Sequence, residues 1–94
     1  MNQATVRIPT PLRSFTGGAA EVRVEGSTVA QALDALGLRH EGILERVLAA
    51  DGQVRGFVNI YLGETNVKTL GGLEAPLPDA AVISIVPAVA GGAR

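Results

Sequence analysis

The most constraining part of this sequence is a short run of β-forming residues near its end, Val82-Ile83-Ser84-Ile85-Val86. Branched apolar side chains at this density are typical of a strand that lies in the centre of a sheet. Successive side chains of a strand point to opposite faces. If Ile83 and Ile85 face the core, then Ser84 and Val86 face outward.

Three further segments are predicted strands, because polar and apolar residues alternate in each: residues 5–8, 21–25 and 57–62. The segment 9–18 contains two prolines and a Gly-Gly pair, so we expect an antiparallel hairpin with a long loop. After residue 62, the sequence predicts a turn at 63–66, a brief pairing segment at 67–70 and irregular chain at 76–79.

An amphipathic helix is predicted between the second and third strands. Thr28 and Gln31 have the spacing of a capping box, in which side chains satisfy free amides at a helix start. Gly37 is the expected stop. The apolar residues of the helix fall on one face at positions 29, 32, 33 and 36. A second short helical segment is predicted at residues 43–48, closed by Asp51-Gly52.

These elements predict a single α+β domain, in which a helix covers one face of a mixed sheet. The chain has 94 residues and three aromatic residues, so its one modest core must consist of Val, Ile, Leu and Ala. We expect the domain to span residues 1–87 and a flexible C-terminal tail to span residues 88–94.

Several classes of function are disfavoured by charge and composition. The formal net charge is −1, and the basic residues are dispersed, so no patch for nucleic acid is expected. Without cysteine, and with His40 as the single histidine, neither a thiolate nor a multi-histidine metal site is possible. The chain shows no secretory signal and no apolar stretch of membrane-spanning length. A cytoplasmic protein is the expectation.

No set of side chains predicts an enzyme active site. Ser14, Ser27 and Ser84 lack the glycine-flanked elbow of a nucleophilic serine. Glu41 and Glu45 are one helical turn apart, but a solvated helix face explains them better than a catalytic pair. We therefore assign no catalytic residue and no metal ligand, and we expect that the protein is not an enzyme.

The C-terminal segment is the remaining candidate. Gly91 and Gly92 lack Cβ atoms, so an extended backbone there could enter a narrow channel in a partner protein. On composition alone, a frayed glycine-rich terminus is the commoner explanation.

The order of elements resembles the ThiS/MoaD family of ubiquitin-like (β-grasp) sulfur carriers, over essentially the whole chain. The resemblance depends most on residues 85–92 (IVPAVAGG), 57–61 (FVNIY), 8–13 (IPTPLR), 16–18 (TGG) and Gly72-Leu73. These segments are most similar to the actinobacterial branch that supplies sulfur for cysteine biosynthesis. The resemblance implies a β-grasp fold and a carrier function.

The resemblance also implies the chemistry and the partners. An ATP-dependent enzyme of the ubiquitin-activating type would adenylate the carboxylate of Gly92, and sulfur would then displace AMP to give a thiocarboxylate. Ala90, Gly91 and Gly92 would enter the partner's active site. A pyridoxal-phosphate synthase would present an aminoacrylate to the sulfur, and a zinc metalloprotease would release cysteine. The carrier itself would bind no cofactor.

Two residues depart from the family pattern, because family members usually end at the second glycine. Here Ala93 and Arg94 follow Gly92. We therefore expect a precursor from which a protease removes Ala93 and Arg94. An added extension or an inactive relative is the alternative.

A partner surface is predicted beside the tail, with Val86 as the docking residue and Phe57 or Tyr61 beside it. Ordinary sheet packing explains these three residues equally well. Two other functions stay open: a protein modifier that joins target lysines through Gly92, and a non-catalytic synthase subunit whose tail docks without carrying sulfur.

Overall fold

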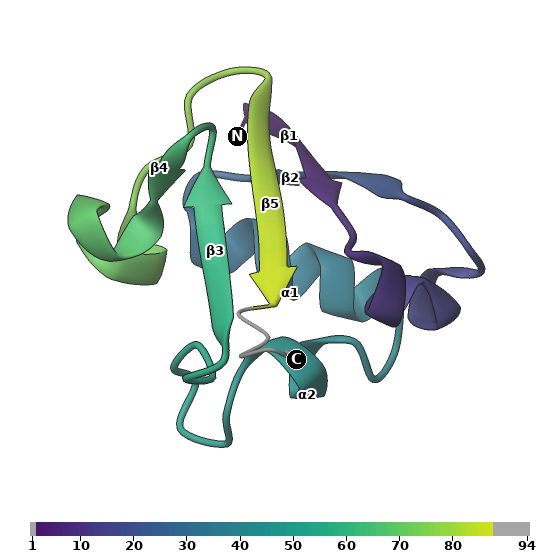
Figure 1. Cartoon of the computed structure of the whole chain (residues 1–94). Coiled ribbons are helices and arrows are strands. Elements are labelled where there is room, and N and C mark those ends of the chain that lie inside the picture. Colours follow the sequence, from purple (N-terminus) through teal and green to yellow (C-terminus); the bar gives the residue numbers. More distant parts are fainter. Residues whose placement is uncertain (1, 88–94) are drawn as a thin grey trace.

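Five strands form one mixed sheet in the computed structural model, which describes residues 2–87 (Figure 1). The strands are β1 (Asn2–Arg7), β2 (Glu21–Gly26), β3 (Val58–Leu62), β4 (Thr65–Asn66) and β5 (Ala81–Pro87). Their order across the sheet is β2-β1-β5-β3-β4. The helices are α1 (Val29–Arg39) and α2 (Leu44–Val47), with 3₁₀ helices η1 (Thr10–Thr16), η2 (Val67–Leu70) and η3 (Gly72–Glu74).

Strand β5 occupies the centre of the sheet, as its sequence predicts. It pairs in parallel with β1, where Val6 lies opposite Ile83. On its other side it pairs antiparallel with β3, where Ile60 lies opposite Ile85. Strands β1 and β2 form the predicted antiparallel hairpin, with η1 in its connection.

The core lies between the sheet and α1, which covers one sheet face (Figure 1). Ile83 and Ile85 are buried, whereas Val86 is 41% exposed, so the predicted alternation of β5 is confirmed. The buried hydrophobic residues are all Val, Ile, Leu or Ala, as expected from the shortage of aromatic residues. They come from β1, β2, β3, β5, α1, α2, η2 and the connections between them.

The capping pair at the start of α1 is present, with a small shift. Thr28 is the N-cap, and its Oγ1 accepts a hydrogen bond from the Gln31 amide at 3.2 Å. In return, the Gln31 Oε1 accepts from the amide of Ser27, one residue before the cap, at 2.7 Å. The first interaction satisfies an amide that the first helical turn leaves without a partner, and the second satisfies the amide that precedes the cap.

The prediction that Gly37 ends the helix is wrong, because α1 continues to Arg39 and is capped by His40. Gly37 has a packing role instead. A Cβ atom at this position would lie 2.5 Å from the Leu44 Cδ1 atom. Glycine therefore allows the segment that begins α2 to lie directly against α1.

The segments predicted to be loops are more regular than expected. Part of the predicted loop at 9–18 forms η1, with Pro11 in its first turn, where a missing amide hydrogen is harmless. Strand β4 forms within the predicted turn at 63–66. Residues 67–70 form η2 rather than pairing, because the Asn66 side chain accepts from the Lys68 amide and caps a helical turn.

Gly26 provides a test of the contact between β2 and α1. An added Cβ atom would lie 2.8 Å from the backbone nitrogen of Ala32, which cannot move without disturbing the helix. We expect Gly26→Ala to lower the free energy of unfolding by about 1–3 kcal/mol in urea denaturation. Gly56→Ala is the matched control, because nothing lies within 4 Å of its added Cβ atom. Equal stability of the two variants would contradict the close contact.

Candidate functional site

The candidate site lies at the end of the domain where β5 stops. Pro87, the last described residue, pairs with Val58 at the start of β3. The predicted tail residues Ala90, Gly91 and Gly92 and the predicted extension, Ala93 and Arg94, lie outside the described residues. The part of the site that the structure describes is therefore the surface around Pro87.

Two of the predicted docking residues share the face of the sheet opposite α1. Val86 lies across from Asn59, and Tyr61 lies across from Ser84 on the same pair of strands. Val86 and Tyr61 are therefore diagonal neighbours, with Cα atoms about 7–8 Å apart. Val86 is 41% exposed and Tyr61 is half-buried. This open face thus presents an apolar and an aromatic side chain near the end of β5.

The third predicted docking residue, Phe57, borders a different surface. It precedes β3 by one residue and is 59% exposed. It lines a groove together with Pro87, the last residue of β5. The structure therefore divides the predicted docking surface into an open-face part and a groove part.

This groove, here named the tail-exit groove, has a volume of about 420 Å³. Its floor includes Val58 and Ile85, which are buried core residues of the two central strands. Most of its lining is apolar, and its charged residues come from α2 and the segment before β3. The complete lining is Pro11, Leu12, Glu45, Arg46, Arg55, Phe57, Val58, Ile85 and Pro87.

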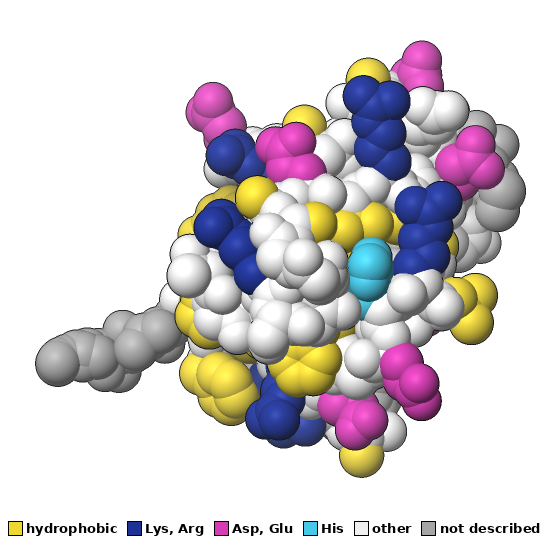
Figure 2. All heavy atoms as spheres, turned by 90° about the vertical axis from the view of Figure 1, so that its right-hand side faces the viewer, with side chains coloured by type: hydrophobic (Ala, Val, Ile, Leu, Met, Phe, Trp, Pro, Cys, Tyr) yellow, Lys and Arg dark blue, Asp and Glu magenta, His cyan; other side chains and the backbone are white. Residues whose placement is uncertain are grey.

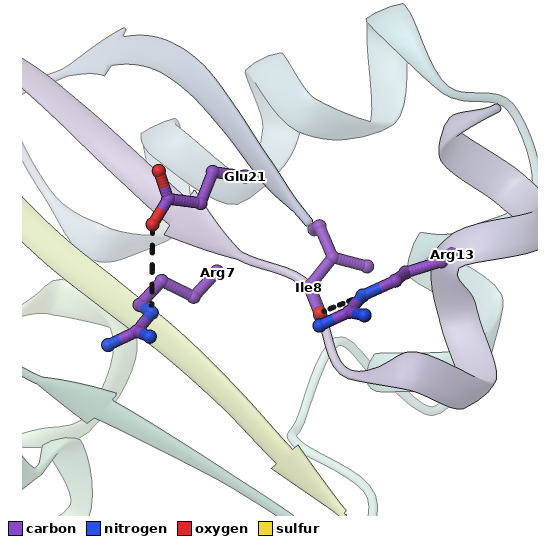
Figure 3. Close-up of polar contacts among 4 residues, drawn as sticks. All are labelled: Arg7, Ile8, Arg13 and Glu21. Atoms are coloured by element: carbon purple, nitrogen blue, oxygen red, sulfur yellow. Dashed lines mark hydrogen bonds and ion pairs between the residues drawn. The ribbon is translucent and has the colours of Figure 1, made fainter. Parts of the chain in front are cut away.

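One wall of the groove is η1, which supplies Pro11 and Leu12. Arg13 holds this short helix against the end of β1, because its Nε donates a hydrogen bond to the Ile8 carbonyl at 3.1 Å (Figure 3). At the other end of η1, the buried Thr16 hydroxyl lies 2.8 Å from the Ala19 carbonyl and donates to it. Side-chain contacts at both ends thus position the wall.

The rim of the groove carries two arginines whose side chains are held by neutral groups. The Arg46 guanidinium lies 5.6 Å from the centroid of the Phe15 ring. The Arg55 Nε donates to the Glu45 carbonyl at 2.8 Å. Within residues 2–87 the one ion pair joins Arg7 to Glu21, on the β1–β2 hairpin (Figure 3). Neither rim arginine is therefore paired with a carboxylate of the described residues.

The sequence patterns did not predict that Arg46, Arg55 and η1 border this groove. Arg46 and Arg55 are nine positions apart, and only the turn between α2 and β3 brings both to one groove. Pro11 was a usable signal for the wall, since proline is favoured in the first turn of a helix. No pattern in the sequence predicts that Arg46 and Arg55 line the same groove.

The polar residues weighed as catalytic do not converge. Ser14 lies on η1, Ser27 precedes α1, Ser84 lies on β5 and His40 caps α1. Among residues 2–87, no group of three or more His, Asp and Glu side chains is placed to hold a metal ion. On the face shown in Figure 2, basic and acidic side chains are interspersed rather than gathered by sign.

The helices of the described segment are also too short or too polar to span a bilayer.

Arg13 tests how the η1 wall is held. Replacing Arg13 with Gln removes the hydrogen bond from Nε to Ile8, so we expect a loss of about 0.5–1.5 kcal/mol in the free energy of unfolding. Amide hydrogen exchange should also accelerate in residues 10–16. Arg23→Gln on the exposed face of β2 is the control and should change stability by less than about 0.5 kcal/mol. Unchanged exchange in η1 would show that Arg13 does not position the wall.

A sequence model of the ThiS family matches residues 6–92 of this chain. The match ends at Gly92 and leaves Ala93 and Arg94 outside it.

Known proteins are similar over nearly the whole length. The chain is 40% identical to "Sulfur carrier protein CysO" of Mycobacterium tuberculosis, over 94% of this chain and 97% of that protein. A chain in the crystal structure of the Amycolatopsis orientalis BexX/CysO complex is 43% identical, with a TM-score of 0.88 over 95% of this chain and 99% of that chain. Small archaeal modifier protein 1 of Methanosarcina acetivorans is 26% identical, with a TM-score of 0.85 and 98% coverage of both chains.

Proposed function

Because this chain belongs to the ThiS family and is a sulfur carrier protein rather than an enzyme, we propose that it carries sulfur as a thiocarboxylate on Gly92. The observation that supports this most strongly is the 40% identity to a sulfur carrier over nearly the full length of both proteins. The family match also ends at Gly92, the residue to which the resemblance assigns the reactive carboxylate.

Formation of the thiocarboxylate needs an activating enzyme, because a carboxylate is a poor acyl donor until one oxygen becomes part of a good leaving group. In the proposed first step, a carboxylate oxygen of Gly92 attacks the α-phosphate of ATP, and pyrophosphate leaves. Sulfide then attacks the acyl carbon, the bond to the phosphate oxygen breaks, and AMP leaves. All of this chemistry is supplied by the partner and by the carrier's own C-terminus.

The sulfur then passes to an acceptor held by a synthase, in the biosynthesis of cysteine or of another sulfur-containing metabolite. The thiocarboxylate sulfur attacks an electrophilic alkene carbon, and the adjacent carbon takes a proton. The amine of the product then attacks the acyl carbon. The bond between the acyl carbon and sulfur breaks, which leaves an amide and a free thiol. Hydrolysis of the resulting amide by a metalloprotease restores the Gly92 carboxylate. Pyridoxal phosphate and zinc would belong to these partners.

Removal of Ala93 and Arg94 must precede activation, since Gly92 has no free carboxylate in the full chain. This step exposes the terminal carboxylate that the activating enzyme uses. A protease therefore joins the activating enzyme and the synthase as a required partner.

The open face around Val86 supports docking of the activating enzyme close to the tail. We expect Val86→Asp to lower kcat/KM for adenylation by about tenfold or more, because a charge would enter an apolar contact. Val82→Asp is the matched control: it lies on the same face of β5 and is 37% exposed, but it is about 13 Å further from Pro87. Unchanged kinetics of the Val86 variant, with both variants folded, would remove Val86 from the interface.

Intact-mass measurement tests the central proposal. The full chain and a chain that ends at Gly92 are each incubated with the source organism's activating enzyme, ATP and sulfide. The shortened chain should gain the mass that corresponds to exchange of one oxygen for sulfur, and the full chain should not. Protein isolated from its native cells should lack Ala93 and Arg94. A shortened chain that stays unmodified would contradict the carrier mechanism.

The similarity to small archaeal modifier protein 1 favours a second candidate, in which activated Gly92 forms an isopeptide bond with lysines of other proteins. This function uses the same activation step but a nitrogen acceptor. Gly-Gly remnants on lysines of cellular proteins after proteolysis would support it. A thiocarboxylate without such remnants would favour sulfur transfer alone.

A further inference from the structure

We propose that the tail-exit groove receives an apolar side chain flanked by acidic residues from the enzyme that activates Gly92. This inference rests on the proposed function and deepens it by naming the chemistry of the partner surface. It concerns a second contact, separate from the open face of β3 and β5 on which Val86 and Tyr61 lie.

The position of the groove places it close to the active site of the partner. Pro87 lines the groove, and Gly92 follows it five positions later in the sequence. An extended chain of five residues spans at most about 17 Å. When the Gly92 carboxylate reaches an active site, the rim of that active site must therefore lie within this distance of Pro87. The surface of the activating enzyme around its entrance then lies over this end of the domain.

The floor of the groove suits one bulky apolar side chain. Val58 and Ile85 close it from the core side, and Phe57, which is 59% exposed, lies at its border. A volume of about 420 Å³ accommodates an aromatic or large aliphatic residue with its flanking backbone. Such side chains, seated in pockets and shielded from water, supply much of the energy of protein interfaces.

The charge of the groove rim indicates which charge the partner segment should carry beside this side chain. Arg46 and Arg55 stand on it together with Glu45, so the rim has an excess positive charge. Arg55 uses its Nε for the Glu45 carbonyl, and its terminal nitrogens have no hydrogen bond to another described residue. The whole chain has a net charge of −1, so the positive charge of the rim is opposite in sign to the net charge of the protein. Carboxylates on the partner complement it.

Two other occupants fit less well. A second copy of this chain would bring its own Arg46 and Arg55 toward the same positive rim in a symmetric contact. The chain's own terminal segment cannot fill the groove while Gly92 lies in the active site of the activating enzyme. An acidic partner segment is the occupant that agrees with the charge.

The test measures pyrophosphate release by the activating enzyme as a function of carrier concentration, with chains that end at Gly92. The charge-reversed pair Arg46→Glu and Arg55→Glu is compared with the pair Arg23→Glu and Lys68→Glu, which makes the same change in net charge on β2 and η2. We expect KM to rise by about tenfold or more for the groove pair, with kcat unchanged and with weaker dependence on salt. The control pair should stay within about twofold of the parent.

Two further variants separate recognition from folding. Arg46→Lys with Arg55→Lys retains both charges and should keep KM near the parent value. Phe57→Ser removes apolar contact from an exposed position and should raise KM without lowering the melting temperature. Thermal unfolding of every variant shows which of them are folded.

The outcomes decide the proposal. Equal effects of the groove pair and the control pair overturn it, as does an equal loss in the lysine pair, which would indicate a structural role for the arginines. A lower KM in the groove pair would mean that the chain's own terminal segment occupies the groove, and an altered oligomeric state would mean that a second copy does. Failure of the parent chain to be adenylated would reject the proposed function itself.

Discussion

The structure depends on the pairing of β5 with strands on both of its sides. Its parallel partner β1 begins the described chain and its antiparallel partner β3 precedes it, so the last strand inserts between two earlier ones. The parallel pair requires a crossover, and the connection between β1 and β5 contains every other element. Burial of Ile83 and Ile85 beneath α1 contributes about 1.5–3 kcal/mol for each side chain.

This central position also explains where the functional surface lies. The end of a central strand is surrounded by structure, so Pro87 shares a groove with residues of η1, α2 and the start of β3. Each of these segments supplies part of the tail-exit groove. The contact from Arg13 to the Ile8 carbonyl and that from Arg55 to the Glu45 carbonyl therefore stabilise the proposed recognition surface as well as local structure.

In the proposed mechanism, the carrier has a reactive carboxylate at Gly92 and a separate surface that its partner recognises. The open face at Val86 is apolar, whereas the groove joins an apolar floor to a cationic rim. Two surfaces of different chemistry on one small domain allow a partner to be selected by both shape and charge.

Local periodicity and composition were enough to predict the central strand, the hairpin, the capped helix and the aliphatic core. They also predicted that Ile85 is buried and Val86 exposed. The folded structure was needed to show that Gly37 is a packing contact rather than a helix end, that Phe57 lines a groove, and that Arg46 and Arg55 share its rim. These properties arise where segments distant in the chain meet, and local patterns do not encode such distances.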